Sequence, residues 1–140
     1  MSEGAPPLVA LVGFKRSKLS LAGGVRVLVV PDGTVRILGK KGRVDLDAAV
    51  GELSARLTRT RTVELRSDAG SLIVYGFTEM TKVATELEEI AARESADAEL
   101  IGPTPSALFL GFLTPKDATE PATASRAIAE ALHERGVGQG

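Results

Sequence analysis

The amino-acid sequence predicts an α+β domain in which antiparallel strands come first and helices follow. Two observations indicate this class. Short apolar segments in the first half alternate with turn-forming residues, and a longer segment with helical periodicity follows them. With 140 residues, the chain is long enough to form one domain around a single hydrophobic core.

Two hairpins supply most of the predicted sheet. Pro31-Asp32-Gly33 separates one pair of strand-like segments, and Ser67-Asp68-Ala69-Gly70 separates another. Proline presets φ for a turn, and Asp and Gly adopt the conformations that reverse a chain. The predicted strands are residues 8–14, 25–30, 34–38, 62–66 and 71–75.

Residues 44–57 fit two structures. As a helix, the segment would gather its apolar residues on one face and begin at Asp45 or Asp47 as N-cap. As strands, it would alternate apolar and polar residues from Leu53 to Leu57. Gly51 is unfavourable inside a helix, but the periodicity leaves both alternatives open.

The clearest helix is expected from Thr78 to about Ala96. The Thr78 hydroxyl can cap the first N–H groups, and Arg93 suits the negative end of the helix dipole. Apolar residues recur at spacings of three and four along one face. They are Met80, Val83, Ala84, Leu87, Ile90 and Ala91.

The chain divides into a flexible N-terminus at residues 1–7, a domain at residues 8–96 and a tail at residues 97–140. Ile101-Gly102-Pro103-Thr104-Pro105 breaks helix and strand alike. A short Ala-rich helix is expected at about residues 122–134.

An apolar segment in the tail, residues 106–113, has three interpretations. It can pack on the sheet and complete the core, it can form an interface with a second subunit or a partner, or it can insert into a membrane interface. The residues concerned are Leu108, Phe109, Leu110, Phe112 and Leu113.

Charge is distributed unevenly along the chain. From Phe14 to Arg66 there are twelve Lys and Arg against five Asp and Glu, and from Ser67 to Gly140 there are five against twelve. This pattern fits a basic binding surface beside an acidic helix, or two parts that neutralise each other across the fold. The sequence has no cysteine and no secretory signal, so we expect a cytoplasmic protein.

No catalytic or metal-binding motif is found in the sequence. The sole histidine, His133, has no Ser or Asp constellation around it, and one histidine with scattered carboxylates does not make a metal site. Gly33 and Gly39 are separated by five residues where a P-loop has four, and Lys41 stands where Ser or Thr must bind magnesium. We therefore expect a protein that is not an enzyme and needs no cofactor or metal.

Two basic clusters are the candidate binding residues, and both lie in expected loops. They consist of Lys15, Arg16 and Lys18, and of Lys40, Lys41 and Arg43. If the loops meet at one rim, six cations would bind phosphates or an anionic bilayer. Solubilising loop charge is the alternative. Nucleic acid is not an expected partner, because aromatics make up 4% of the chain and the pI is about 5.9.

The order of the predicted elements resembles that of pleckstrin-homology-like (PH-like) domains, in particular the small bacterial ones. The likeness covers residues 8–93. It rests on the hairpin at residues 25–38, on Arg43-Val44-Asp45-Leu46-Asp47 as an entry to the middle strands, and on the hairpin at 62–77 that leads directly into the Thr78 helix. The resemblance implies a strongly bent antiparallel sheet, or incomplete barrel, of about seven strands closed by the helix. Outside the likeness, we expect the tail to add a strand or helix.

The resemblance also implies a function. Domains of this family mostly bind lipids, peptides or proteins. In the lipid-binding members, basic residues between the first two strands contact anionic headgroups, and Lys15, Arg16 and Lys18 occupy that region here. The family pattern also has basic residues spaced one apart on the second strand, where this chain has Gly24 and Arg26.

We expect a non-catalytic binding module that recognises a protein or peptide, with a protein partner or a second copy as its target and assembly as its purpose. The alternative is peripheral binding to anionic lipid headgroups at the inner face of the cell membrane, through the two basic clusters.

Overall fold

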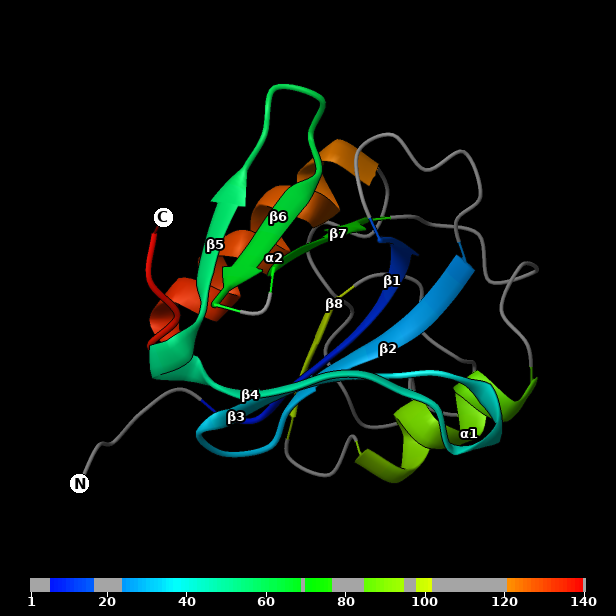
Figure 1. The fold of residues 1–140 in the computed structure, drawn as a ribbon. Coiled ribbons are helices and arrows are strands. Elements are labelled where there is room, and N and C mark those ends of the chain that lie inside the picture. Colours follow the sequence, from blue (N-terminus) through cyan, green and yellow to red (C-terminus); the bar gives the residue numbers. More distant parts are fainter. Residues whose placement is uncertain are drawn as a thin grey trace.

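The computed structural model describes residues 6–16, 24–68, 70–76, 85–94, 98–101 and 121–139. These residues contain one bent sheet with helices on two sides (Figure 1). The strands are β1 (Leu8–Lys15), β2 (Gly24–Val30), β3 (Thr34–Leu38), β4 (Val44–Ala49), β5 (Ser54–Leu57), β6 (Val63–Ser67), β7 (Gly70–Tyr75) and β8 (Glu99–Ile101). The α-helices are α1 (Thr85–Glu94) and α2 (Pro121–Glu134), and the short 3-10 helices are η1 (Lys40–Gly42) and η2 (Val50–Glu52).

β1 is the central strand of the sheet. It pairs with β2 from Leu8 to Phe14, while its other edge is shared by two strands. β7 pairs antiparallel with its end, at Gly13 to Lys15, and β8 pairs parallel with its beginning, at Leu8 to Ala10. The apolar run of β1 is continuous because both faces of the strand are covered.

The sheet runs in the order β4-β3-β2-β1-β7-β6-β5, with β8 beside β1. The two predicted hairpins are confirmed as β2–β3 and β6–β7. The ambiguous segment at residues 44–57 consists of β4, η2 and β5, so the helical alternative is wrong. Apart from β8 the sheet is antiparallel. Its two end strands, β4 and β5, do not pair with each other, so the sheet is not closed.

Each face of the sheet carries its own apolar cluster. The main core lies on one face and is covered by α2, and its large buried members include Leu8, Leu28, Ile37, Leu65, Ile128 and Leu132. The second cluster lies on the other face under α1, and consists of Val9, Leu11, Val27, Val29, Leu87, Ile90 and Ala91. The alternation of β1 residues between the two clusters follows from the period of two in a strand.

The helix that packs on the main core is therefore α2, whereas the resemblance had implied the helix expected from Thr78. The small residues Ala129 and Ala131 of α2 are buried in the main core together with Ile128 and Leu132. The described part of the Thr78 helix, α1, buries Leu87, Ile90 and Ala91 as its periodicity predicted. Residues 77–84 and 95–97 lie outside the described ranges.

Two parts of the tail belong to the sheet and its core. Ile101, the first residue of the segment expected to break helix and strand alike, ends β8, where its backbone pairs with Ala10. The helix expected at 122–134 is confirmed as α2, which belongs to the same core as the strands. Sequence periodicity does not detect β8, because a three-residue strand is too short to show one.

At both outer edges of the sheet, some backbone N–H and C=O groups form hydrogen bonds within the protein. At the β4 edge, the Ala49 N–H donates to the Glu52 carboxylate over 3.2 Å. At the β5 edge, Gly138 exchanges backbone hydrogen bonds with Leu53 and Ala55, and His133 Nε2 lies 2.8 Å from the Ala55 carbonyl oxygen. Such contacts reduce the tendency of open edges to pair with other chains.

We predict that Leu132→Ala lowers the free energy of unfolding by about 2–5 kcal/mol, because it leaves a cavity in the main core. Leu132 is fully buried there. Urea denaturation followed by circular dichroism measures the change. Arg126→Ala, at an exposed position of the same helix, is the control and should stay within about 0.5 kcal/mol of the wild type. Equal costs for the two variants would contradict the placement of α2.

Candidate anion-binding site

A bulge in β4 directs Asp45 toward the arginines at the start of β2 and the end of β1. Ile37 pairs with Leu46 but Leu38 pairs with Val44, so Asp45 is an extra residue opposite β3. Bulges of this kind re-aim a side chain and bend the strand that contains them. The Asp45 side chain is only 1% exposed, so its carboxylate needs partners inside the protein.

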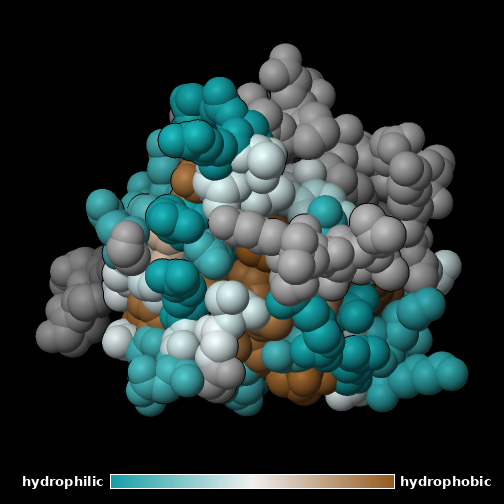
Figure 2. Space-filling view, turned by 45° about the horizontal axis from the view of Figure 1, so that its top comes forward, coloured by the Kyte–Doolittle hydropathy of each residue, from teal (hydrophilic) through white to brown (hydrophobic). Residues whose placement is uncertain are grey.

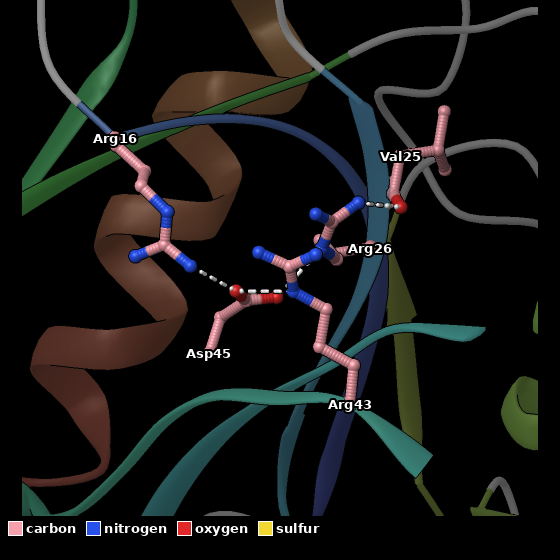
Figure 3. Close-up of polar contacts among 5 residues, drawn as sticks. All are labelled: Arg16, Val25, Arg26, Arg43 and Asp45. Atoms are coloured by element: carbon pink, nitrogen blue, oxygen red, sulfur yellow. Dashed lines mark hydrogen bonds and ion pairs between the residues drawn. The ribbon is translucent and has the colours of Figure 1, made fainter. Parts of the chain in front are cut away.

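Three guanidinium groups surround the Asp45 carboxylate (Figure 3). Arg16 from the end of β1 donates through Nη2 to Oδ1 over 2.8 Å, and Arg43 donates through Nε to the same oxygen over 3.0 Å. Arg26 from the start of β2 donates through Nε to Oδ2 over 2.6 Å. Residues far apart in the sequence thus meet at one carboxylate, and we call Arg16, Arg26, Arg43 and Asp45 the arginine cluster.

Arg26 is the least exposed of the three arginines. Its side chain is 17% exposed, its Nη1 also donates to the Val25 carbonyl oxygen, and its guanidinium carbon lies 4.9 Å from the centroid of the Phe14 ring. Glycines leave room for it. A Cβ at Gly24 would lie 2.8 Å from Arg26 Nη1, and one at Gly39 would lie 3.1 Å from Arg26 Cδ. A basic side chain in place of Gly24 would require Arg26 to move.

The electrostatics of the cluster keep Asp45 ionised. Burial by itself raises the pKa of Asp45, but hydrogen bonds and positive charge from Arg26 and Arg43 outweigh burial and lower the pKa below its ordinary value of 3.8. The carboxylate therefore remains a fixed negative charge at neutral pH. It orients the three guanidinium groups.

The cluster has spare capacity to bind an anion. Three guanidinium groups and one carboxylate leave two positive charges in excess. Arg16 is 58% exposed and Arg43 is 51% exposed, and within the described residues each uses one nitrogen for Asp45. A guanidinium group has five N–H donors, so several donors on both arginines face water. The arrangement can bind a carboxylate or a phosphate group.

The structure places the predicted basic residues in different surroundings. Arg16 and Arg43 come together around Asp45. Lys15 is on the opposite face of β1, with Nζ 5.8 Å from the centroid of the Tyr75 ring. Lys40 and Lys41 are exposed in η1, next to Arg43. Lys18 and the apolar segment with Leu108, Phe109, Leu110, Phe112 and Leu113 lie outside the described residues.

Sequence reasoning missed the two residues at the centre of the cluster, Arg26 and Asp45. Arg26 was noticed only as a departure from a family pattern. Asp45 was named as a possible N-cap of a helix that does not form and within the entry to the middle strands, but not as a partner of arginines. One local signal existed. Arg26 is a lone charge in a strand that is otherwise apolar, and such a residue needs a partner when it is partly buried.

Comparison with known proteins identifies no relative. No protein-family model matches the chain, and no curated protein or solved structure matches it at a significant level. The resemblance to PH-like domains therefore stays a prediction, and the candidate site rests on its own geometry. Within the described ranges, no group of three or more His, Asp or Glu residues is arranged to bind a metal ion.

We predict that Asp45→Asn lowers the free energy of unfolding at pH 7 by about 1–3 kcal/mol, because it removes the charge that pairs with three arginines. The loss should itself depend on pH. Since the folded-state pKa of Asp45 is lowered, the charge stabilises the fold above pH 3.8, and this contribution disappears as the pH falls through the folded-state pKa.

Urea denaturation of the wild type and the variant at neutral pH and at several acidic values measures this difference. Asp47→Asn is the matched control, since Asp47 is 55% exposed and lies 3.6 Å from Arg36. It should cost less than about 0.5 kcal/mol. A difference between wild type and Asp45→Asn that grows as the pH falls would contradict the assignment.

Proposed function

We propose that this chain is a non-catalytic module that binds an anionic group of a partner protein or peptide. One observation carries the proposal: the buried carboxylate of Asp45 orients three guanidinium groups, two of which are half exposed. A site oriented before binding loses less side-chain entropy when the partner arrives. Acidic side chains are the ligand chemistry that fits it, because arginine binds carboxylates through two parallel hydrogen bonds.

The chemistry of the cluster favours binding over catalysis. Arginine stays protonated in proteins and does not act as a general base. Asp45 accepts hydrogen bonds from three donors and has a lowered pKa, which makes it a poor proton acceptor near neutral pH. The residues of the cluster can attract and orient an anion, but they do not supply a nucleophile.

We predict that an oligoglutamate peptide binds the full chain, and that Arg16→Gln/Arg43→Gln weakens its binding at least about tenfold. Each arginine lost removes charge-assisted hydrogen bonds worth about 1.5–3 kcal/mol. Isothermal titration calorimetry at low salt measures the affinity, with an oligoglutamine peptide as the uncharged probe. Arg36→Gln is the control variant, since Arg36 is an exposed arginine of β3 outside the cluster.

Two results would speak against this proposal. Equal binding of the two peptides would mean that the partner's charge is not recognised. Equal loss in Arg36→Gln and in the double variant would mean that general surface charge, and not the cluster, attracts the peptide.

Peripheral membrane binding is the second candidate function. The exposed Lys40 and Lys41 in η1, directly before Arg43, favour it, since they widen the basic surface beyond the cluster. Among the described helices none has the length and apolar character needed to span a bilayer. Membrane contact through Lys40 and Lys41 would follow the anionic lipid content of the surface.

We predict for this candidate that Lys40→Gln/Lys41→Gln reduces sedimentation with phosphatidylserine-containing vesicles. Each charge removed should weaken the free energy of vesicle binding by about 1 kcal/mol. Pure phosphatidylcholine vesicles are the control surface. Vesicle binding that rises with phosphatidylserine, together with no binding of oligoglutamate, would favour the membrane over a protein partner. Binding of the peptide alone would favour the protein partner.

A further inference from the structure

The β5–β6 hairpin is a second basic surface, distinct from the arginine cluster. Residues 54–67 contain four arginines and one acidic residue. The arginines are Arg56, Arg59, Arg61 and Arg66, and all four are exposed. In Figure 1 the loop between β5 and β6 projects above the other described elements. Figure 2 brings that side toward the viewer, and most described atoms in its upper part are hydrophilic.

A hydrogen-bond network makes the turn of this hairpin well defined. Thr58 N–H donates to the Thr62 carbonyl oxygen over 2.8 Å, and Arg61 N–H donates to the Thr58 carbonyl oxygen over 3.1 Å. The Thr58 hydroxyl lies 2.7 Å from the Thr62 hydroxyl and 3.1 Å from the Thr60 hydroxyl. The loop of three residues between Thr58 and Thr62 is therefore held by its own backbone and threonines.

Arg61 occupies a backbone conformation that favours glycine. Its φ is +65°, in the left-handed region, as expected for the last residue of a three-residue hairpin loop. Side chains other than glycine, asparagine and aspartate are uncommon there, and strained residues of this kind cluster at functional positions. An arginine at this place puts a cation at the tip of the hairpin at a cost in backbone strain.

Glu64 orients the arginines along the strands. Its side chain is 8% exposed, and its carboxylate lies 2.9 Å from Arg56 Nη2 and 3.7 Å from Arg66 Nε. Arg59 and Arg61 at the tip form no ion pair with any described residue. The hairpin therefore presents two partly oriented cations on its strands and two open ones at its tip.

The composition of the surface indicates the chemistry of its partner. Within the described ranges the only exposed large hydrophobic residue is Val44 on β4, so the hairpin offers no apolar centre for a stable protein interface. Nucleic-acid interfaces are more polar and more positively charged. The hairpin has no aromatic residue on which unpaired bases could stack, which favours a duplex over a single strand.

We propose that the β5–β6 hairpin binds the phosphate backbone of double-stranded nucleic acid. Arginines and threonine hydroxyls are common donors to phosphate oxygens. The contact is independent of base sequence. This contact uses residues other than those of the proposed anion site. It also reverses the expectation that nucleic acid is not a partner, because the local charge of the hairpin, and not the overall pI, determines the contact.

The salt dependence of binding tests this proposal with the full chain and a random-sequence DNA duplex. Four phosphate contacts would give a slope of log Kobs against log salt of about −3.6. Arg59→Gln/Arg61→Gln should weaken binding and reduce the size of this slope by about 1.8. Arg36→Gln/Arg126→Gln, which removes two exposed arginines elsewhere, should leave the slope unchanged. Fluorescence anisotropy measures all three proteins.

Arg61→Gly separates loss of contact from loss of folding. Glycine relieves the left-handed strain, so the variant should melt at the wild-type temperature or above while the slope falls by about 0.9. The hairpin arginines are not part of the arginine cluster, so failure of the proposed anion site leaves this proposal intact.

Three results would overturn the hairpin proposal. The first is that the duplex does not bind at low salt. The second is that the slope changes equally in the hairpin and control variants. The third is that the hairpin variants bind DNA normally but no longer bind phosphatidylserine vesicles or oligoglutamate.

Discussion

The rest of the structure depends on the burial of β1. This strand pairs on both edges and packs on both faces, so it contributes to the main core under α2 and to the second cluster under α1. The same strand ends at the candidate site. Phe14 packs against Arg26, and Arg16 follows directly where β1 stops. Because β1 cannot shift without exposing one of two apolar clusters, the position of Arg16 on the fold is well determined.

Buried carboxylates organise the two basic surfaces in the same way. Asp45 orients the arginine cluster, and Glu64 orients two arginines of the β5–β6 hairpin. A buried ion pair adds little net stability, since desolvation offsets much of the attraction. Its use here is geometric. An acid beneath exposed guanidinium groups restrains side chains that would otherwise sample many rotamers, and leaves their outer donors open.

Backbone conformation also helps to fix the positions of cations on the two basic surfaces. Among the described residues, Lys41 and Arg61 are the two with positive φ that are not glycine, and both are cations in exposed turns. The turn that contains Lys41 is further fixed by α1, because the Lys41 N–H donates to the Glu86 carboxylate. A helix on one face of the sheet thereby fixes the loop that precedes Arg43 and the anion site.

The sequence by itself determined the two hairpins, the apolar face of α1 and the helix α2, because turn chemistry and periodicity act over a few neighbouring residues. Only the tertiary structure decided that residues 44–57 are strands, that β8 pairs with β1, and that Arg26 meets Asp45. Each of these depends on contacts between distant parts of the chain. Residues 44–57 suit a helix and a strand about equally well by themselves. Pairing of β4 with β3 and of β5 with β6 satisfies their backbone groups, buries Ala55 and partly buries Leu46 and Leu57, and this decides between the two.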